Sequence, residues 1–257
     1  MMQRLQGWQL LIFCGIVLGV TDKSSAAILG FGDFKQFSVN KNDTQSAPNL
    51  SPGQIEITSG DFGESRSVFA LTPQATAGFT ASFTYRATNV LADLGDGAAF
   101  VIQNSPSGAA AKGATFGDFG YSDITNSVAL AFDLTSSEAG LFTGGNGGRG
   151  ASPLGSINLV SGDAIDVALS YHANSLSVLL TDETTKQTSS LLYQIDIPAM
   201  VGGTTAFVGF TAGSPDPTSQ FISNFTYTGI PEPSSIALLA IGGAAAIGLS
   251  RRFHKKQ

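Results

Sequence analysis

The sequence predicts an all-β protein whose globular part is a sandwich of two antiparallel sheets. Apolar and polar residues alternate with a period of two in short runs rich in Val, Ile, Thr and Phe. Clusters of Gly, Pro, Ser and Asn separate these runs and indicate turns. No strong amphipathic pattern with a 3.6-residue period occurs between residues 28 and 230. Because no helical layer is then expected to cover a sheet, two sheets must cover each other.

The first 27 residues have the composition of a signal peptide. Arg4 precedes an apolar run from Trp8 to Val20, and residues 24–27 supply the small side chains that signal peptidase accepts. The apolar run is short for a helix that spans a membrane, although an uncleaved anchor is the alternative. We therefore expect a signal helix over residues 1–27, signal peptidase as a partner, and an exported mature chain.

Candidate strands follow in the middle region. In chain order they are Gln54–Thr58, Gly78–Arg86, Ala98–Gln103, Ser127–Leu134, Ala164–Tyr171, Ser175–Thr181, Ser189–Ile195, Thr204–Thr211 and Phe221–Tyr227. His172-Ala173-Asn174 stands between two alternating runs and indicates a hairpin loop.

The middle region is acidic. Between residues 28 and 230, seven Lys or Arg stand against seventeen Asp or Glu, a net charge of −10, because the other basic residues lie in the two end segments. Such a surface repels phosphate backbones, which argues against nucleic acid as a partner. The only cysteine, Cys14, lies in the leader, so the mature domain is expected to have neither a disulfide nor a thiol nucleophile.

The ionisable residues are not arranged for catalysis. A retaining glycosidase needs two carboxylates about 5 to 5.5 Å apart, which on a strand comes from acidic residues about two positions apart. Glu56, Asp61 and Glu64 are not in that register, and His172 is the sole histidine between the end segments. With one histidine and no cysteine, this region has few residues that could form a catalytic triad. We therefore expect no enzymatic activity.

The carboxyl end has three consecutive parts. Pro231-Glu232-Pro233 precedes an apolar stretch from Ile236 to Leu249, and a basic cluster follows over residues 251–256. A turn, a short apolar helix and a cationic stop would hold the chain in the inner membrane with the basic end inside. The alternative is an ordinary tail anchor, but the apolar stretch is short for a helix that must cross a bilayer hydrocarbon core ~30 Å thick.

This order resembles the PEP-CTERM sorting signal. The resemblance implies that residues 230–257 form a sorting tail with a transmembrane helix, and that Pro231, Glu232 and Pro233 are its motif. It also implies exosortase, a membrane-embedded transpeptidase, as a partner. We therefore expect transient anchoring in the inner membrane, followed by location at the cell surface or in the extracellular matrix.

Residues 96–133 carry a second specific pattern. Asp96-Gly97-Ala98-Ala99-Phe100 begins a strand, a Gly-rich loop ends in Gly120-Tyr121, and Asn126-Ser127-Val128-Ala129-Leu130-Ala131-Phe132-Asp133 follows. This pattern resembles the L-type (legume-type) lectin domain. Further segments resemble later strands of that family: Tyr171–Leu180, Val208–Ala212 and Phe221–Phe225. The resemblance extends over residues 28–229 and implies a concanavalin-like jelly-roll sandwich.

The lectin resemblance implies a calcium and a transition-metal site. The family holds its ions with a Glu-x-Asp pair, an Asn four residues after the Asp, a second Asp and a His, since hard cations need several oxygen ligands. Asp133 matches the Asp, but Ala131 takes the Glu position and Ser137 takes the Asn position, and no Asp occurs between Asp133 and Asp163. Calcium is thus the candidate ion, but the family's ligand set for it is incomplete. We therefore expect no cofactor.

The same resemblance implies sugar-contacting residues. The family's sugar-binding Asp corresponds to Asp96, and its backbone-donating glycine corresponds to Gly117 or Gly120, of which we favour Gly117. Alternatively, Asp96 accepts local backbone hydrogen bonds in a Gly-Asp-Gly turn. Residues 144–150 are expected to be a flexible insertion, in which Asn146 is a ligand only if the loop folds back.

Two functions follow from these expectations. The first is a carbohydrate-binding, lectin-like module for exopolysaccharide, with which PEP-CTERM systems are associated; Phe116, Phe119 and Tyr121 then either stack on sugar rings or pack in the core. The second is a structural surface or biofilm protein that kept the sandwich and lost metal and sugar binding. Ala131 and Ser137 favour the second function.

Overall fold

A computed structural model describes residues 28–230, with the exception of 43, 45, 91–95, 115–116 and 149–151. The expected signal helix, the sorting motif Pro231-Glu232-Pro233, the C-terminal apolar stretch and Phe116 lie outside the described residues. Within the described part of the chain, no helix is long and apolar enough to cross a membrane.

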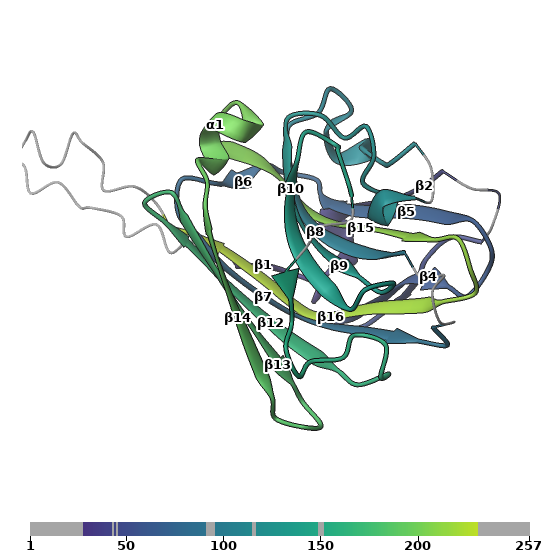
Figure 1. Ribbon diagram of the computed structural model, residues 1–257. Helices are drawn as coiled ribbons and strands as arrows, with labels where there is room; N and C mark the ends of the chain where they lie inside the picture. The colour runs from purple at the N-terminus through teal and green to yellow at the C-terminus, as the bar shows by residue number, and fades with distance from the viewer. Residues whose placement is uncertain are drawn as a thin grey trace, which may run out of the picture.

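The described chain forms two eight-stranded antiparallel sheets that pack face to face (Figure 1). Sheet A has the order β14 (Thr188–Gln194), β13 (Ser175–Asp182), β12 (Ile165–His172), β7 (Phe79–Thr88), β16 (Ser219–Gly229), β4 (Gln54–Ser59) and β3 (Asn49–Ser51), with β1 (Ile28–Gly30) paired to β16. Sheet B has the order β11 (Ser152–Pro153), β10 (Glu138–Thr143), β9 (Ser127–Asp133), β8 (Gly97–Gln103), β15 (Thr205–Ser214), β5 (Glu64–Ala70) and β2 (Phe37–Lys41), with β6 (Gln74–Ala75) paired to β15.

The predicted strands are all present, with ends that differ from the prediction by at most three residues. The expected loop after β12 is a two-residue hairpin connection, in which Ala173 and Asn174 both adopt positive φ (49° and 60°). Four short helices were not predicted: η1 (Phe34–Gln36), η2 (Gly108–Ala110), η3 (Asp118–Gly120) and α1 (Ile197–Val201). None exceeds five residues, so none shows the amphipathic period of a long helix.

The main core lies between the sheets. It is dominated by aromatic side chains, of which Phe83, Phe100, Phe210 and Phe225 form a connected cluster with ring centroids 4.9–6.3 Å apart. Phe210 is fully buried. Packing of this kind supplies the apolar burial that a domain without disulfides needs.

A second core lies on the outer face of sheet B. As the alternation in β9 predicts, Val128, Leu130 and Phe132 enter the main core, whereas Ala129 and Ala131 enter this second core. The segment between β8 and β9 covers it, through side chains such as Phe119. Strands β8 and β9 are therefore buried on both faces, and a loop layer covers sheet B where none was expected.

Candidate functional site

The two carboxylates singled out from the sequence lie at the adjoining ends of the neighbouring strands β8 and β9 of sheet B. Asp133 ends β9 opposite Gly97, the residue after Asp96, and the backbone N–H of Leu134 donates to the Asp96 carbonyl at 2.9 Å. Burial, and then the charges of Asp96 and Asp133, raise the pKa of the Tyr85 hydroxyl well above its ordinary value. That hydroxyl is 2.8 Å from Gln220 Oε1, to which it donates. Backbone pairing thus brings Asp96 and Asp133 together.

Asp96 is oriented by the glycine loop. Its Oδ2 accepts a hydrogen bond from the backbone N–H of Phe119 at 2.8 Å, across 23 residues. Phe119 and Asp118 present this loop in left-handed conformations, with φ of 62° and 54°. The carboxylate therefore has a backbone partner in the loop, while residues 91–95, which precede it, lie outside the described part of the chain. An Asp held in this way has a fixed side-chain direction.

Gly97 allows Asp96 to reach this position. Its φ is +146°, and a Cβ built there would lie 1.9 Å from the Phe132 carbonyl oxygen. Only glycine lets β8 begin at this distance from β9. The Asp-Gly sequence is thus a local requirement of the site.

The two candidate glycines of the loop have different surroundings. Gly120 donates its N–H to the Gly117 carbonyl at 3.2 Å, and a Cβ on it would lie 2.4 Å from the Ala212 carbonyl oxygen. Gly117 precedes η3 in an extended conformation. This difference favours Gly117 over Gly120 as a backbone donor to a ligand.

The carboxylate of Asp133 is hydrogen-bonded within the turn that follows β9. Its Oδ1 accepts backbone N–H groups of Thr135 at 2.7 Å and Ser136 at 3.3 Å, and the residue is 4% exposed. Ser137, at the position of the expected Asn ligand, has φ 55° and accepts the Leu159 N–H through Oγ at 2.9 Å. Among the described residues, no group of three or more His, Cys, Asp or Glu is placed to hold a metal. The donor set at Asp133 does not fit a calcium ion, which needs six to eight oxygens.

The described part of the loop after β10, residues 144–148, folds back onto the segment that contains η3. Asp123 donates its N–H to the Gly145 carbonyl at 3.1 Å, and Gly147 lies so close to Asp118 that a Cβ would meet the Asp118 Cβ at 2.4 Å. Asn146 is exposed and bonds to Thr143 of its own hairpin through its backbone N–H at 3.2 Å. The loop therefore packs against η3, and Asn146 is bridged to Thr143, which pairs with Val128 at the opposite end of β9 from Asp133.

Phe119 and Tyr121 pack in the second core. They are 3% and 0% exposed, the Phe119 ring lies 5.9 Å from that of Phe142, and the Tyr121 hydroxyl is 2.5 Å from Ser127 Oγ. Of the two roles considered for these aromatics, core packing is confirmed for both. A sugar bound beside Asp96 would have to use other apolar contacts.

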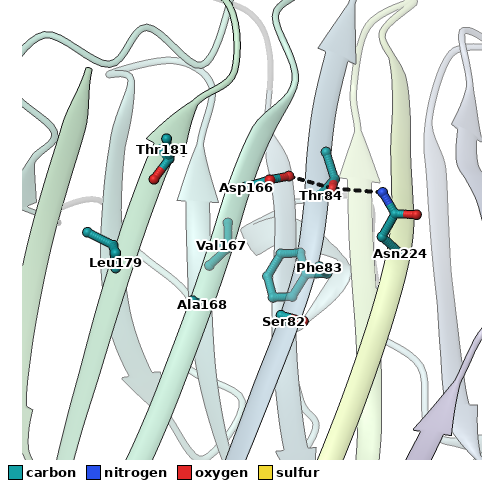
Figure 2. Close-up of a pocket in the computed structure, with 9 residues that line it drawn as sticks. All are labelled: Ser82, Phe83, Thr84, Asp166, Val167, Ala168, Leu179, Thr181 and Asn224. Carbon is teal, nitrogen blue, oxygen red and sulfur yellow. Dashed lines mark hydrogen bonds between the residues drawn. The ribbon is translucent and has the colours of Figure 1, made fainter. Parts of the chain in front are cut away.

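A recess on the outer face of sheet A was not predicted. It has a volume of about 230 Å³ and lies over β16, β7, β12 and β13 (Figure 2). Asn224 Nδ2 donates to Thr84 Oγ1 at 3.2 Å, and Thr84 donates to Asp166 Oδ1 at 2.6 Å, which forms a polar row along the recess (Figure 2). Asn224 lies at a β-bulge with φ 55°. The sequence signal was the broken alternation at Ser223-Asn224.

Comparison with solved structures shows the same fold in plant lectins. Lectin II from Ulex europaeus matches with a TM-score of 0.63 and 19% identity, over 80% of this chain and 99% of that one. Peanut lectin with a nine-residue peptide matches with a TM-score of 0.63 and 20% identity, over 81% and 100%. Arcelin-5, a lectin-like defense protein from Phaseolus vulgaris, matches with a TM-score of 0.60 and 16% identity, over 80% and 98%.

Family models match both the middle domain and the carboxyl-terminal tail that the sequence analysis distinguished. Comparison with curated proteins found no match. The model of the PEP-CTERM protein-sorting motif matches residues 229–252, which confirms the resemblance of the tail. The legume lectin domain model matches residues 33–237, more than half of the chain and all of both sheets except β1. The chain therefore belongs to the legume lectin domain family and carries a PEP-CTERM sorting motif at its carboxyl end.

Proposed function

We propose that this protein is exported and binds carbohydrate of an exopolysaccharide at the cell surface or in the extracellular matrix. The observation that carries the proposal is the match of a lectin domain directly followed by a sorting motif in one chain. Asp96, oriented by Phe119, would accept hydrogen bonds from sugar hydroxyls, and Gly117 would donate its backbone N–H. No enzymatic step is part of this function.

The route to the surface follows from the two ends of the sequence. Signal peptidase would remove residues 1–27, and the apolar stretch from Ile236 to Leu249 would hold the chain in the inner membrane. Exosortase would then process the tail at Pro231-Glu232-Pro233. The match to the sorting motif supports this route.

A glycan array with and without calcium tests the binding function. The exported protein, Asp96→Asn and a control variant, Asp166→Asn, are compared. We expect binding that does not depend on calcium, is reduced at least about tenfold in Asp96→Asn through loss of one charged hydrogen bond, and is unchanged in Asp166→Asn. Absence of signal on every glycan in both conditions would contradict the proposal.

A structural surface protein without sugar binding is the second candidate. It is favoured by the carboxylates themselves, since Asp96 bonds to the Phe119 N–H and Asp133 to its own turn. In that case the site geometry serves folding alone, and Asp96→Asn would change stability without changing any binding.

A further inference from the structure

Both ends of the described chain lie at one end of the sandwich. Ile28 is paired with Thr228 in the β1–β16 ladder, and the Ile230 N–H donates to the Gly78 carbonyl at 2.8 Å. Thr76, two residues before Gly78, donates to the Thr204 carbonyl at 2.9 Å, which places the loop after α1 there as well. Figure 1 shows α1 and β6 at this end and the turn between β15 and β16 at the opposite one. We refer to it as the tail end.

Large apolar side chains are exposed at the tail end. Ile28 is 68% exposed and Ile230 is 46% exposed. Met200 is 45% exposed on α1, whose Ile197 and Val201 are buried and hold it in place. Leu71, which follows β5 and donates its N–H to the Gln36 carbonyl, is 51% exposed. All four are large apolar side chains that are exposed at the same end of the sandwich.

Ionisable residues are few at the tail end. Near it lie Asp33, Lys35, His172 and Asp196, and Asp196 is used as the N-cap of α1, where it accepts the Ala199 N–H at 3.0 Å. Most of the acidic residues lie toward the opposite end, around the turns that end β4, β9, β13 and β15: Asp61, Glu64, Asp96, Asp133, Glu138, Asp163, Asp166, Asp182, Glu183 and Asp216. The negative charge of the domain is thus directed away from the tail end.

The tether between the domain and the apolar stretch is short. Ile236 is six residues after Ile230, a distance that an extended chain covers in at most about 21 Å. After removal of the leader, the α-ammonium of Ile28 adds one positive charge at the tail end. A surface with exposed apolar side chains and little negative charge, held this close to a bilayer, meets the interfacial region, where exposed apolar side chains are buried and an acidic surface would be repelled.

We infer that, while the tail is in the membrane, the tail end of the domain rests on the lipid surface through Leu71, Met200, Ile28 and Ile230. This inference rests on the proposed sorting function. The ends of β8 and β9 with Asp96 and Asp133 are then directed away from the membrane, toward a polymer outside the cell. The membrane contact would orient the lectin domain before the tail is processed.

Depth-dependent quenching tests this contact in the exported chain, residues 28–257, which has no native thiol because Cys14 lies in the leader. Single cysteines are introduced as Leu71→Cys, Met200→Cys, Phe62→Cys or Ala245→Cys. Phe62 is 66% exposed in the turn between β4 and β5, at the opposite end, and serves as the matched control. A fluorophore on each cysteine is measured in phosphatidylethanolamine and phosphatidylglycerol vesicles that carry spin-labelled lipid.

We expect quenching of the probes at positions 71, 200 and 245, and about twofold less quenching at position 62. Side chains at positions 71 and 200 would lie within ~10 Å of the acyl boundary. If only position 245 is quenched, the lipid contact is wrong and the membrane tail stands. If position 245 is not quenched, the sorting-tail proposal fails together with the inference. Equal quenching at positions 62 and 200, or quenching at 200 that rises with the protein-to-lipid ratio, would overturn the orientation in favour of random tumbling or a second copy.

Discussion

The position of Asp96 depends on one glycine. Gly97 has φ +146° and no room for a Cβ, because the Phe132 carbonyl oxygen would be 1.9 Å away. Gly97→Ala is expected to lower the free energy of unfolding by about 3 kcal/mol, through strain and overpacking together. Urea denaturation of the purified domain measures this change.

A second glycine separates these two causes. Gly162 also has positive φ, +87°, but has nothing within 4 Å of a built Cβ. Gly162→Ala should therefore cost only about 1 kcal/mol, the penalty of a left-handed conformation for an L-residue. Equal losses in the two variants would show that the contact with Phe132 is relieved at little cost.

The hydrogen bonds of Asp133 lead to a prediction about calcium. Its Oδ1 accepts two backbone N–H groups, and Ala131 and Ser137 supply no carboxylate or amide oxygen. We expect calcium chloride to leave the thermal midpoint of unfolding unchanged. A site with Kd a hundredfold below the calcium concentration would stabilise the fold by about 2.7 kcal/mol, or about 5–10 °C for a domain of this size. A shift of that size that Asp133→Asn abolishes would contradict the prediction.

Single residues also show how far the sequence could predict the site. The motifs identified Asp96 and Asp133, but their adjacency became visible only in the pairing of β8 with β9. The bond from Asp96 to the Phe119 N–H was not predictable, because it links positions 23 residues apart and needs a positive φ at a phenylalanine. Positive φ is rare for such a residue, so no local pattern signals it.

At the level of secondary-structure elements, nine strands were predicted, including β8 and β9, which are buried on both faces, whereas β2, β5 and β10 were not predicted. In β12 buried and exposed positions alternate throughout, and the strand was predicted to within one residue at each end. In β5 every residue is buried, including Glu64 and Arg66, whose side chains form an ion pair with an N···O distance of 2.5 Å. Alternation disappears when both faces are covered, so β5 gave no period-two signal. The short strands β1, β3, β6 and β11 are fixed by their partners and were missed for that reason.

The hairpin between β13 and β14 has a titratable turn. The backbone N–H of Thr185, then that of Thr184, donate to Asp182 Oδ1 at 2.8 Å each and lower the pKa of the Asp182 carboxyl below its ordinary value. A lowered pKa in the folded state stabilises the fold above the unfolded pKa, and this contribution is lost as pH falls through the folded pKa. We therefore expect Asp182→Asn to be less stable than the wild type at neutral pH.

The pH dependence of that difference is the measurement. Urea denaturation at a series of pH values should show the gap between the two proteins closing as pH falls from above the ordinary Asp pKa to below the folded one. A gap that stays constant over this range would mean that the charge of Asp182 contributes nothing beyond the hydrogen bonds that Asn also accepts.

At the scale of the whole molecule, the sequence predicted two layers and the structure has a partial third. The segment between β8 and β9 lies over sheet B and buries Ala99, Val101 and Ala129 on its outer face. Its apolar residues are separated by glycines and follow no helical or strand period, so its packing could not be read from a pattern. This layer also carries the N–H group that orients Asp96. The covering loop and the candidate site are therefore one structural unit.

Removal of the tail tests the division of the chain into a folded domain and a sorting segment. Deletion of residues 231–257 leaves every described strand intact, since β16 ends at Gly229 and Ile230 is already bonded to Gly78. We expect the truncated protein to be exported, to fold with an unchanged thermal midpoint, and to appear in the medium, because it lacks the apolar stretch and basic cluster that hold a chain in the membrane. Fractionation of cells and medium measures this release. The matched control replaces Pro231-Glu232-Pro233 by alanines, and this variant should stay in the membrane unprocessed. A truncated protein that remains with the cell envelope would show that retention resides in the lectin domain.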